Sequence, residues 1–398
     1  MLQNVKDALK ELYYDPKFRG IDVNARFKEA EKQISAAKST WQINAIIAQV
    51  LLDFDDSHTT FYPPDLVVGV NYGFQMQMIG NRCYIIRTGP ETEEKGLKVG
   101  DVVYSIEGFE PTRESLWKII YSYFELLPPP TLRVTIQEAD GRLREVVVNA
   151  VTSKKKRLKV IISDKSPRPP QYFDLSEDVI ICKLAQFDLS DKEVDQMMKR
   201  IGSRKVLILD LRGNPGGFVS MEQRLLGYFF DRNVKIGDEK RRDRIETRFT
   251  KTRGKEKAFG GKVIVLVDSK SASAAEVFAR IMQLEQRGVV VGDTTSGQVM
   301  TSTHVTFAFR SVLQYSTAPT LYGVNITVAD LIMPDGKSLE KIGVTPDVVL
   351  LPSGADLAAK RDPVLAKAAS LAGVELEAEK AGAIFPKVEL DDEDQGGR

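Results

Sequence analysis

The stretch VLILDLRGNPGG, residues 206–217, decides the fold of the second half of this chain. Its first six residues are almost all apolar, which is typical of a strand that is buried on both faces of a sheet. Two glycines close the stretch, and helical spacing follows at about residues 220–230. The stretch therefore predicts a buried strand, a tight glycine turn and a helix.

The same alternation continues on both sides of this stretch. Apolar runs at 179–187, 263–268 and 289–293 precede or follow helical patterns near 192–201 and 274–287. Alternating buried strands and helices indicate an α/β layer with a largely buried sheet. We therefore expect an α/β core at 171–352, in which the densely charged segment 238–257 forms an exposed hairpin or loop.

The remainder of the chain divides into segments that differ in hydrophobic periodicity and composition. Residues 1–66 have helical periodicity and end in the loop DFDDSHTTFYPP, residues 53–64. Short β-like runs separated by turn residues indicate a compact β-rich module at 67–152, with one helix at 113–127. A polar linker follows at 153–170. Residues 353–398 read as a C-terminal helix and an acidic tail, which we expect to be disordered after Gly373.

The composition excludes several classes of protein. The 398 residues carry a net charge of +1, which argues against a nucleic-acid binder. Two Cys and two His make a Cys/His zinc site improbable, and two Cys cannot build a disulfide framework. No apolar run approaches the roughly 20 residues of a membrane helix. Residues 1–15 do not read as a signal peptide, so a cytoplasmic protein and an exported protein without its leader both remain open.

Two motifs in the α/β core have the residues that acyl transfer needs. Backbone N–H groups of the glycine turn DLRGNPGG, 210–217, can approach an anion without a Cβ in the way, although the turn could also be purely structural. Ser273 stands three residues before Glu276, as in a helix-capping box. Ser273 is therefore either a helix cap or a nucleophile at a helix start.

A nucleophilic serine needs a base, and the chain offers two histidines. His58 lies in a polar loop directly after Ser57, whereas His304 lies in the alternating β-run THVTFAF, 303–309. A loop histidine preceded by a serine is the better candidate. Many carboxylates could orient it, and spacing alone does not choose among them.

Taken together, these motifs resemble the carboxyl-terminal processing (tail-specific) serine peptidases of clan SK. The resemblance covers nearly the whole chain and rests on motifs in the family's order: DSHT (56–59), YGFQM (72–76), DLRGNPGG (210–217), SASAAE (271–276), GDTTSG (292–297) and EKIGVTPD (340–347). It implies a PDZ-like domain at 67–152 and a crotonase-like protease core at 171–352. The residues Tyr72, Gly73 and Phe74 resemble the loop that binds a ligand's terminal carboxylate. Polypeptide substrates, recognised through their C-terminal tails, are the implied partners, with no metal or organic cofactor.

The resemblance departs from the majority of the family at one position. Most members use a Ser–Lys dyad, but Gln298 stands where that lysine belongs, and an amide has no usable basicity near neutral pH. Lys270 is near in sequence, but no motif supports it as the base. A minority branch, like the tricorn core and the chlamydial secreted protease, uses Ser, His and Glu.

That minority pattern matches positions of this sequence. It implies Ser273 as nucleophile, His58 as base and Glu340 as its orienting carboxylate, acting through Ser57. The backbone N–H groups of Gly216 or Gly217 and of Ala274 would form the oxyanion hole.

Alternatives to an active peptidase remain open. The loss of the lysine is also compatible with a catalytically silenced scaffold that binds protein C-termini, and a crotonase-like core could act on a non-peptide acyl group. The family resemblance suggests an exported or periplasmic protein, with a cytoplasmic one as the alternative. The N-terminal helices are compatible with a homo-oligomer.

Overall fold

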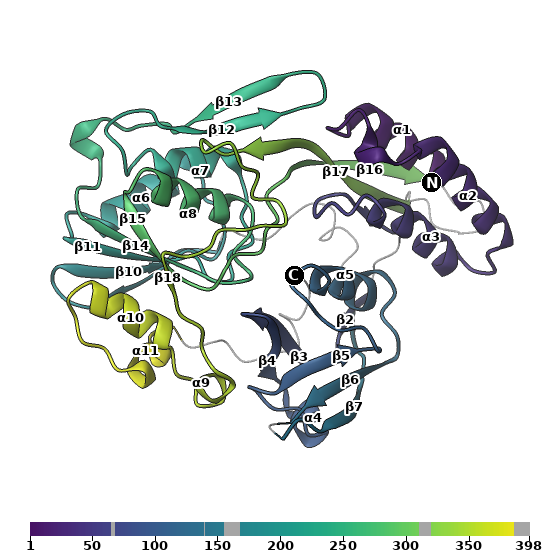
Figure 1. Ribbon diagram of the computed structural model, residues 1–398, viewed down its shortest axis with the longest axis horizontal. Helices are drawn as coiled ribbons and strands as arrows, with labels where there is room; N and C mark the ends of the chain where they lie inside the picture. The colour runs from purple at the N-terminus through teal and green to yellow at the C-terminus, as the bar shows by residue number, and fades with distance from the viewer. Residues whose placement is uncertain (65–67, 139, 155–167, 310–319, 386–398) are drawn as a thin grey trace.

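The computed structural model describes residues 1–64, 68–138, 140–154, 168–309 and 320–385 (Figure 1). Most of the expected linker and the acidic end of the expected tail lie outside the described residues. Three groups of elements, each with its own hydrophobic cluster, occupy different regions of Figure 1.

The N-terminal helices pack against strands from the far end of the chain. They are α1 (Leu2–Leu12), α2 (Val23–Ala36) and α3 (Thr40–Leu52), with a 3₁₀ turn η1 (Phe18–Gly20). They pack on β1 (Thr60–Tyr62), β16 (Thr301–Phe309) and β17 (Thr320–Ile332). β17 pairs with β1, β16 and β12 (Lys235–Lys240) in an antiparallel sheet that ends at β13 (Ile245–Phe249). Leu9, Phe27 and Leu51 share one buried cluster with Phe61 and Val324. The predicted helical segment is confirmed, and it is anchored on β17.

The β-rich module forms a five-stranded antiparallel sheet in chain order. Its strands are β3 (Phe74–Ile79), β4 (Arg82–Thr88), β5 (Val102–Ile106), β6 (Thr131–Gln137) and β7 (Leu143–Asn149), so β3 and β7 are the edges. Beside them lie α4 (Pro90–Glu94), α5 (Leu116–Ile120), the π-helical turn η2 (Tyr121–Leu126), and the pair β2 (Val68–Asn71) and β8 (Val151–Lys154). Alternate residues of β6 are buried, as expected for a sheet with one solvated face.

The α/β core has a six-stranded sheet in the order β18–β15–β14–β11–β10–β9. Its strands are β9 (Gln171–Asp174), β10 (Val179–Lys183), β11 (Val206–Asp210), β14 (Lys262–Val267), β15 (Gly288–Gly292) and β18 (Val348–Val349), and all but β9 are parallel to their neighbours. Helices α6 (Asp191–Ile201), α7 (Val219–Leu226) and α8 (Ala274–Leu284) share one cluster with the sheet. The predicted strand–turn–helix order is confirmed.

The end of the described chain corrects one expectation. Residues after Gly373 were expected to be disordered, but they form α11 (Ala378–Ile384), which follows α9 (Gly354–Ala358) and α10 (Pro363–Leu371). Val374, Leu376 and Phe385 pack with α10 on the other face of the sheet. The segment was expected to be disordered because its composition is acidic. Its few apolar residues are nevertheless ordered, because they pack against the face of the sheet.

The charged segment 238–257 contains the predicted hairpin and a buried ion cluster. Strands β12 and β13 form the hairpin, and the 3₁₀ turn η3 (Lys255–Lys257) follows. Arg248 of β13 donates to Glu222 of α7 at 3.0 and 3.1 Å and to Glu239 of β12 at 3.4 Å. Burial raises the pKa of Glu222 to about 7. This cluster fixes the hairpin to the helix that follows the glycine turn.

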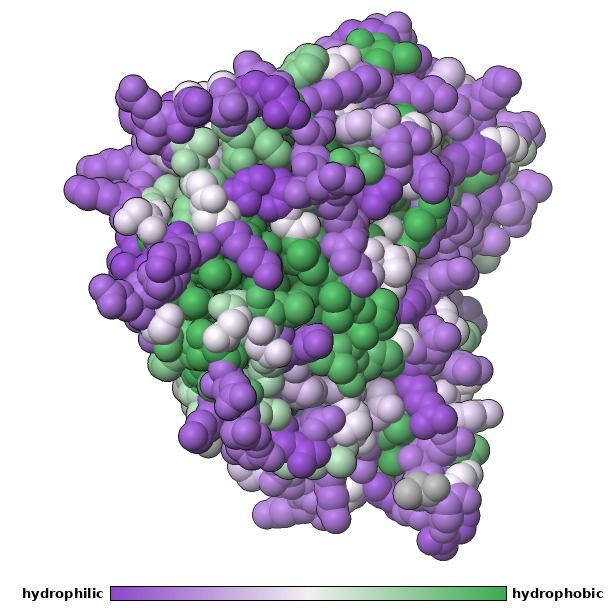
Figure 2. Space-filling view, turned by 60° about the vertical axis from the view of Figure 1, so that its left-hand side comes forward, coloured by the Kyte–Doolittle hydropathy of each residue, from purple (hydrophilic) through white to green (hydrophobic). Residues whose placement is uncertain are grey.

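The surface is mainly hydrophilic on the face shown in Figure 2, with one hydrophobic area near its middle. Among the described residues, no helix combines the length and the apolar character of a membrane span. Both cysteines are free and buried, and they lie in different clusters.

Candidate active site

Ser273 lies at the N-terminus of α8, where the chain leaves strand β14. Its backbone has φ 55° and ψ −120°, a region that costs a non-glycine residue free energy and occurs often at active sites. The Glu276 N–H donates to the Ser273 carbonyl oxygen at 2.9 Å, and no helix N–H among the described residues donates to the Ser273 hydroxyl. Instead the Glu276 carboxylate accepts the Ser273 N–H at 3.0 Å, which leaves the Ser273 hydroxyl available for chemistry.

Glu276 fixes the loop that faces Ser273. This fully buried carboxylate accepts the N–H groups of Gly297 at 2.8 Å and Gln298 at 3.0 Å, and the Thr295 hydroxyl at 2.5 Å. Burial raises its pKa to about 7, although these hydrogen bonds oppose the shift. Sequence reasoning recognised Glu276 only as a capping residue. Its role in holding the 295–298 loop could not be found from local spacing.

The glycine turn after β11 packs closely against Ser273. A Cβ on Gly216, whose φ is +93°, would lie 2.6 Å from the Ser273 Cβ. The Gly216 N–H donates to the Asn214 side chain at 2.8 Å, so it is already occupied. Among the described residues, the N–H groups of Gly217 and Ala274 donate to no protein acceptor. Of the three residues expected at an oxyanion hole, Gly217 and Ala274 therefore have the available donors.

His58, Ser57 and Glu340 form one hydrogen-bonded series. The Ser57 Oγ lies 2.8 Å from His58 Nδ1 and donates to Glu340 Oε2 at 3.2 Å. Since the Ser57 hydroxyl donates its proton to the carboxylate, its oxygen accepts from Nδ1–H, which leaves Nε2 as the basic nitrogen. Ser57 and His58 are neighbours in the chain, and the fold brings Glu340 to them from 283 residues further along.

Burial perturbs both ionisable members of this series. It lowers the pKa of His58 from its ordinary value of 6.5, an effect that the negative charge of Asp56 opposes. Burial raises the pKa of Glu340, while hydrogen bonds from Val299 and Ser57 act in the other direction. Both shifts arise because water is displaced from a charged form.

The loop at residues 297–299 joins the nucleophile to this series. The Gln298 carbonyl accepts the Ser273 N–H at 2.9 Å, and the Val299 N–H donates to Glu340 Oε2 at 2.9 Å. Among the described residues, the Ser273 hydroxyl and the imidazole make no hydrogen bond with each other. Such contacts are often long in unliganded enzymes and tighten when substrate binds.

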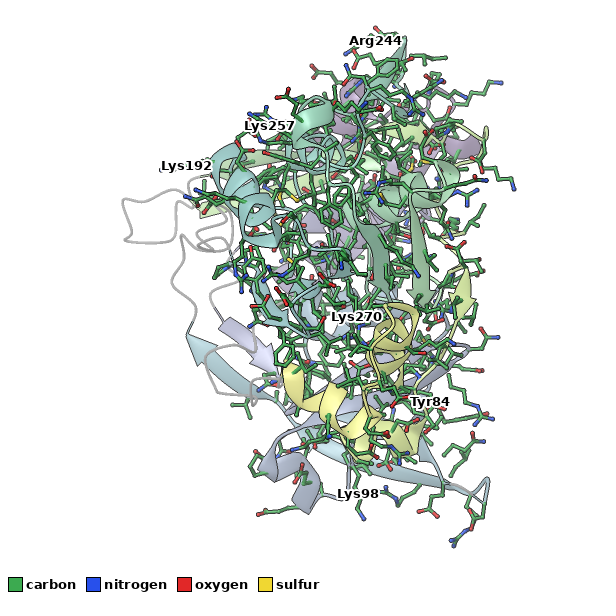
Figure 3. All side chains as sticks on the ribbon, turned by 90° about the vertical axis from the view of Figure 1, so that its left-hand side faces the viewer. Tyr84, Lys98, Lys192, Arg244, Lys257 and Lys270 are labelled. Carbon is green, nitrogen blue, oxygen red and sulfur yellow. The ribbon has the colours of Figure 1, made fainter. Side chains whose placement is uncertain are left out.

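Among the described residues, no hydrogen bond joins the other candidate bases, His304 and Lys270, to Ser273. His304 of β16 is hydrogen-bonded to Asn325 at 2.9 Å and packs edge-on against Tyr62. These contacts give His304 a structural environment in the sheet formed by β1, β16 and β17. Lys270, labelled in Figure 3, belongs to the loop between β14 and α8, three residues before Ser273. Burial lowers the pKa of Lys270, and its charged neighbours include Arg87 of the β-rich module. Gln298 contacts Ser273 through its backbone carbonyl.

The three residues expected to bind a peptide terminus are mostly internal. The side chains of Tyr72 and Phe74 are buried and pack edge-on against Phe124. The Gly73 N–H donates to the Asn71 side chain at 2.7 Å. Any ligand at this place would therefore meet the backbone at the β3 edge.

The β-rich module is held against the loops that carry the site. Arg113 donates to Asp293 at 2.6 Å and to the Thr294 carbonyl at 2.9 Å. Gln77 of β3 donates to Asp268 at 2.8 Å, close before Ser273 in the chain. These bonds fix the module to both loops that flank the nucleophile.

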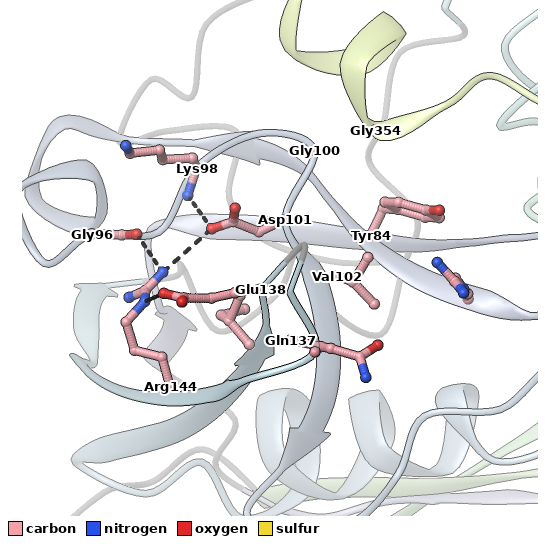
Figure 4. A pocket seen from close by; sticks show the side chains of 13 residues that line it. Tyr84, Gly96, Lys98, Gly100, Asp101, Val102, Gln137, Glu138, Arg144 and Gly354 are labelled. Carbon is pink, nitrogen blue, oxygen red and sulfur yellow. Dashed lines mark hydrogen bonds and ion pairs between the residues drawn. The ribbon is translucent and has the colours of Figure 1, made fainter.

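A cavity of about 920 Å³ lies where this module meets the start of α9, and Gly100 and Gly354 are among the residues that line it (Figure 4). It is polar, and Arg144 inside it contacts Gly96, Asp101 and Glu138. The residues expected to be catalytic do not line it.

Comparison with known proteins places this geometry in context. Residues 178–350 match the sequence model of Peptidase family S41. A "Probable CtpA-like serine protease" of Staphylococcus epidermidis (strain ATCC 12228 / FDA PCI 1200) is 32% identical over 143 residues, which are 36% of this chain and 27% of that protein. A "C-terminal processing peptidase, chloroplastic" of Tetradesmus obliquus is 25% identical over 340 residues, which are 77% of this chain and 67% of that protein. The match to the staphylococcal relative thus spans about a quarter of its length.

The fold is also similar to a solved structure. Mature CPAF superposes with a TM-score of 0.65 at 14% identity, covering 90% of this chain and 93% of that one. At this identity the similarity concerns the fold alone. The S41 match and the named relatives support a serine peptidase.

Proposed function

We propose that this chain is a serine endopeptidase that cleaves polypeptides through an acyl-enzyme on Ser273. The observation that carries the proposal is the hydrogen-bonded series Glu340–Ser57–His58. The loop at residues 297–299 contacts both this series and the strained backbone of Ser273, because Val299 donates to Glu340 and Gln298 accepts from Ser273. Acyl transfer requires a nucleophile, a base and a group that orients the base, and we assign these roles to Ser273, His58 and Glu340.

The mechanism has two halves. The Ser273 Oγ attacks the scissile carbonyl carbon while His58 Nε2 takes the hydroxyl proton. The tetrahedral intermediate then collapses, and the imidazolium gives this proton to the leaving amine, which releases the C-terminal fragment. Water next attacks the ester with His58 again as base, so that the N-terminal fragment leaves as a carboxylic acid and Ser273 is restored.

Two groups stabilise the charges that develop. The free N–H groups of Gly217 and Ala274 receive the oxyanion, and one such donor contributes about 100-fold to 1,000-fold in kcat. The Glu340 carboxylate, through Ser57, keeps Nδ1 protonated and stabilises the imidazolium. Gln298 needs no basic role in this mechanism.

The β-rich module is the proposed PDZ-like domain for substrate tails. Strand β3 is an edge of its sheet, and an extended peptide can add a strand to such an edge while backbone N–H groups capture its carboxylate. Isothermal titration with an apolar hexapeptide in free-acid and C-terminally amidated forms tests this. We expect binding of the free acid only, and equal binding of both forms would contradict tail recognition.

The decisive test of the catalytic proposal is hydrolysis of an unstructured protein by wild type, Ser273→Ala and His58→Ala. Cleavage is expected for wild type only. Wild-type rates in Ser273→Ala would refute the nucleophile, and retained activity in His58→Ala, with Ser273 confirmed, would refute the base.

Covalent labelling separates the enzyme from a silenced scaffold, which the glutamine at position 298 also allows. A fluorophosphonate should modify Ser273 in the enzyme, whereas a scaffold should not react. An exported location and a homo-oligomer stay predictions of the sequence.

A further inference from the structure

Asp56 is a buried carboxylate next to the proposed base that sequence reasoning did not use. Its side chain has no solvent exposure, and it lies two residues before His58 in the loop between α3 and β1. Its Oδ1 accepts the backbone N–H of His58 at 3.0 Å and the hydroxyl of Thr327 at 2.6 Å. Its Oδ2 accepts the hydroxyl of Tyr13 at 2.9 Å.

These three donors come from different parts of the fold. Tyr13 follows α1, Thr327 belongs to β17, and His58 belongs to the loop itself. The Thr327 N–H also donates to the Thr59 hydroxyl at 3.2 Å, which ties the loop to β17 on the other side of the histidine. A buried carboxylate with three donors is held in one place, because leaving it unpaired would cost its full desolvation penalty.

We propose that Asp56 is a positioning residue for His58: its carboxylate fixes the histidine's backbone and places a negative charge beside the imidazole. The inference rests on the proposed function, since it assigns a second carboxylate to the same base. Glu340 acts on the ring through Ser57, whereas Asp56 acts from the backbone side. The negative charge favours the imidazolium that forms when His58 takes the serine proton.

The other charged groups around this loop are already engaged. Asp55 is paired with Lys118 of α5 at 2.6 Å and with Lys341. Arg19 donates to the backbone carbonyls of Phe54 and Asp55 at 3.2 and 2.6 Å. Asp56 and Glu340 are therefore the carboxylates whose removal should change the His58 titration most.

The test is an NMR titration of the His58 ring, which does not depend on activity. The chain has only two histidines, so a His304→Gln background leaves a single imidazole signal. In that background we compare Asp56→Asn with Asp53→Asn, a matched change at a more exposed carboxylate that pairs with Arg26. Asn keeps the shape of Asp56 and removes its charge. The His58 midpoint should move to lower pH in Asp56→Asn and stay at the wild-type value in Asp53→Asn.

Kinetics on a cleavable peptide give the second readout. Asp56→Asn should lower kcat about tenfold with KM unchanged, the size expected for one charge-assisted hydrogen bond. Thr327→Val keeps the Asp56 charge but removes one donor, so it serves if Asp56→Asn does not fold, and it should lower kcat about threefold.

The outcomes separate this inference from the function on which it rests. An unmoved or raised His58 midpoint in Asp56→Asn, or wild-type kcat in Thr327→Val, would overturn the role of Asp56 while leaving the peptidase proposal intact. A protein that cleaves nothing but still shows the shifted titration would fail as a peptidase, with the Asp56–His58 interaction upheld.

Discussion

Replacing Gly216 by alanine should disable the nucleophile through a steric contact that the structure defines. The added Cβ would lie 2.6 Å from the Ser273 Cβ and 2.9 Å from both the Ala272 carbonyl oxygen and the Ala274 nitrogen. Carbon atoms pack at about 3.5 Å or more, so Ser273 or the turn must move by roughly 0.9 Å. A displacement of about 1 Å at a reacting group costs on the order of 100-fold in rate.

Gly213→Ala is the matched control in the same turn. Gly213 also has a positive φ, +74°, so both variants carry a left-handed alanine, but no atom lies within 4 Å of the Cβ it would gain. Left-handed strain costs about 1–2 kcal/mol in either variant. The difference between them therefore isolates the contact with Ser273.

The assay is kcat on a peptide substrate, with urea unfolding to confirm that both variants are folded. We expect kcat to fall about 100-fold in Gly216→Ala and less than threefold in Gly213→Ala. Slower fluorophosphonate labelling of Ser273 should accompany the loss. Equal kcat in the two folded variants would refute the view that the turn is packed against the nucleophile.

Three further results are expected. Burial lowers the pKa of His58, and only the neutral imidazole can act as a base. A pH profile of kcat/KM should therefore lose activity on the acid side with a midpoint below pH 6.5. Activity that rises only above about pH 8 would instead indicate an amine base. Ser57→Ala removes the hydroxyl that lies between the imidazole of His58 and the Glu340 carboxylate. Stopped-flow kinetics should show kcat lower by about tenfold with KM unchanged. An unchanged kcat would show that the Ser57 hydroxyl is dispensable. Arg248→Met leaves the buried Glu222 without its cation, while Glu239 keeps its pair with Arg241. It should lower the free energy of unfolding by about 3–5 kcal/mol, against less than 1 kcal/mol for the exposed Arg244→Met, as measured by urea denaturation; similar losses in both variants would contradict a buried cluster.

Local pattern was sufficient for many of the elements. The apolar run before the glycine turn predicted β11, and small residues before Glu276 predicted the start of α8 at Ser273. These features depend on near neighbours in the chain. The folding of residues 374–385 was missed because their few apolar side chains are significant only against the sheet face that they cover.

The contacts that define the site could not be predicted in the same way. Asp56 is one of three aspartates within four residues, and only its burial against Tyr13 and Thr327 distinguishes it from Asp53 and Asp55. Likewise, Gly216 and Gly217 are adjacent glycines, but only the N–H of Gly216 is occupied, because it donates to the Asn214 side-chain oxygen.

The sequence by itself determined the strand–turn–helix order and the helical start of the chain, and it favoured a loop histidine over a strand histidine as the proposed base. Those conclusions follow from periodicity and residue type, which act over a few positions. The family resemblance implied that Glu340 acts on His58 through Ser57, and the tertiary structure brings these three residues within hydrogen-bonding distance. Tertiary structure alone decided that Glu276 holds the 295–298 loop and which N–H groups stay free among the described residues. The physical reason is that hydrogen bonds of 3 Å between residues far apart in the chain exist only after the sheets have packed and water has been excluded.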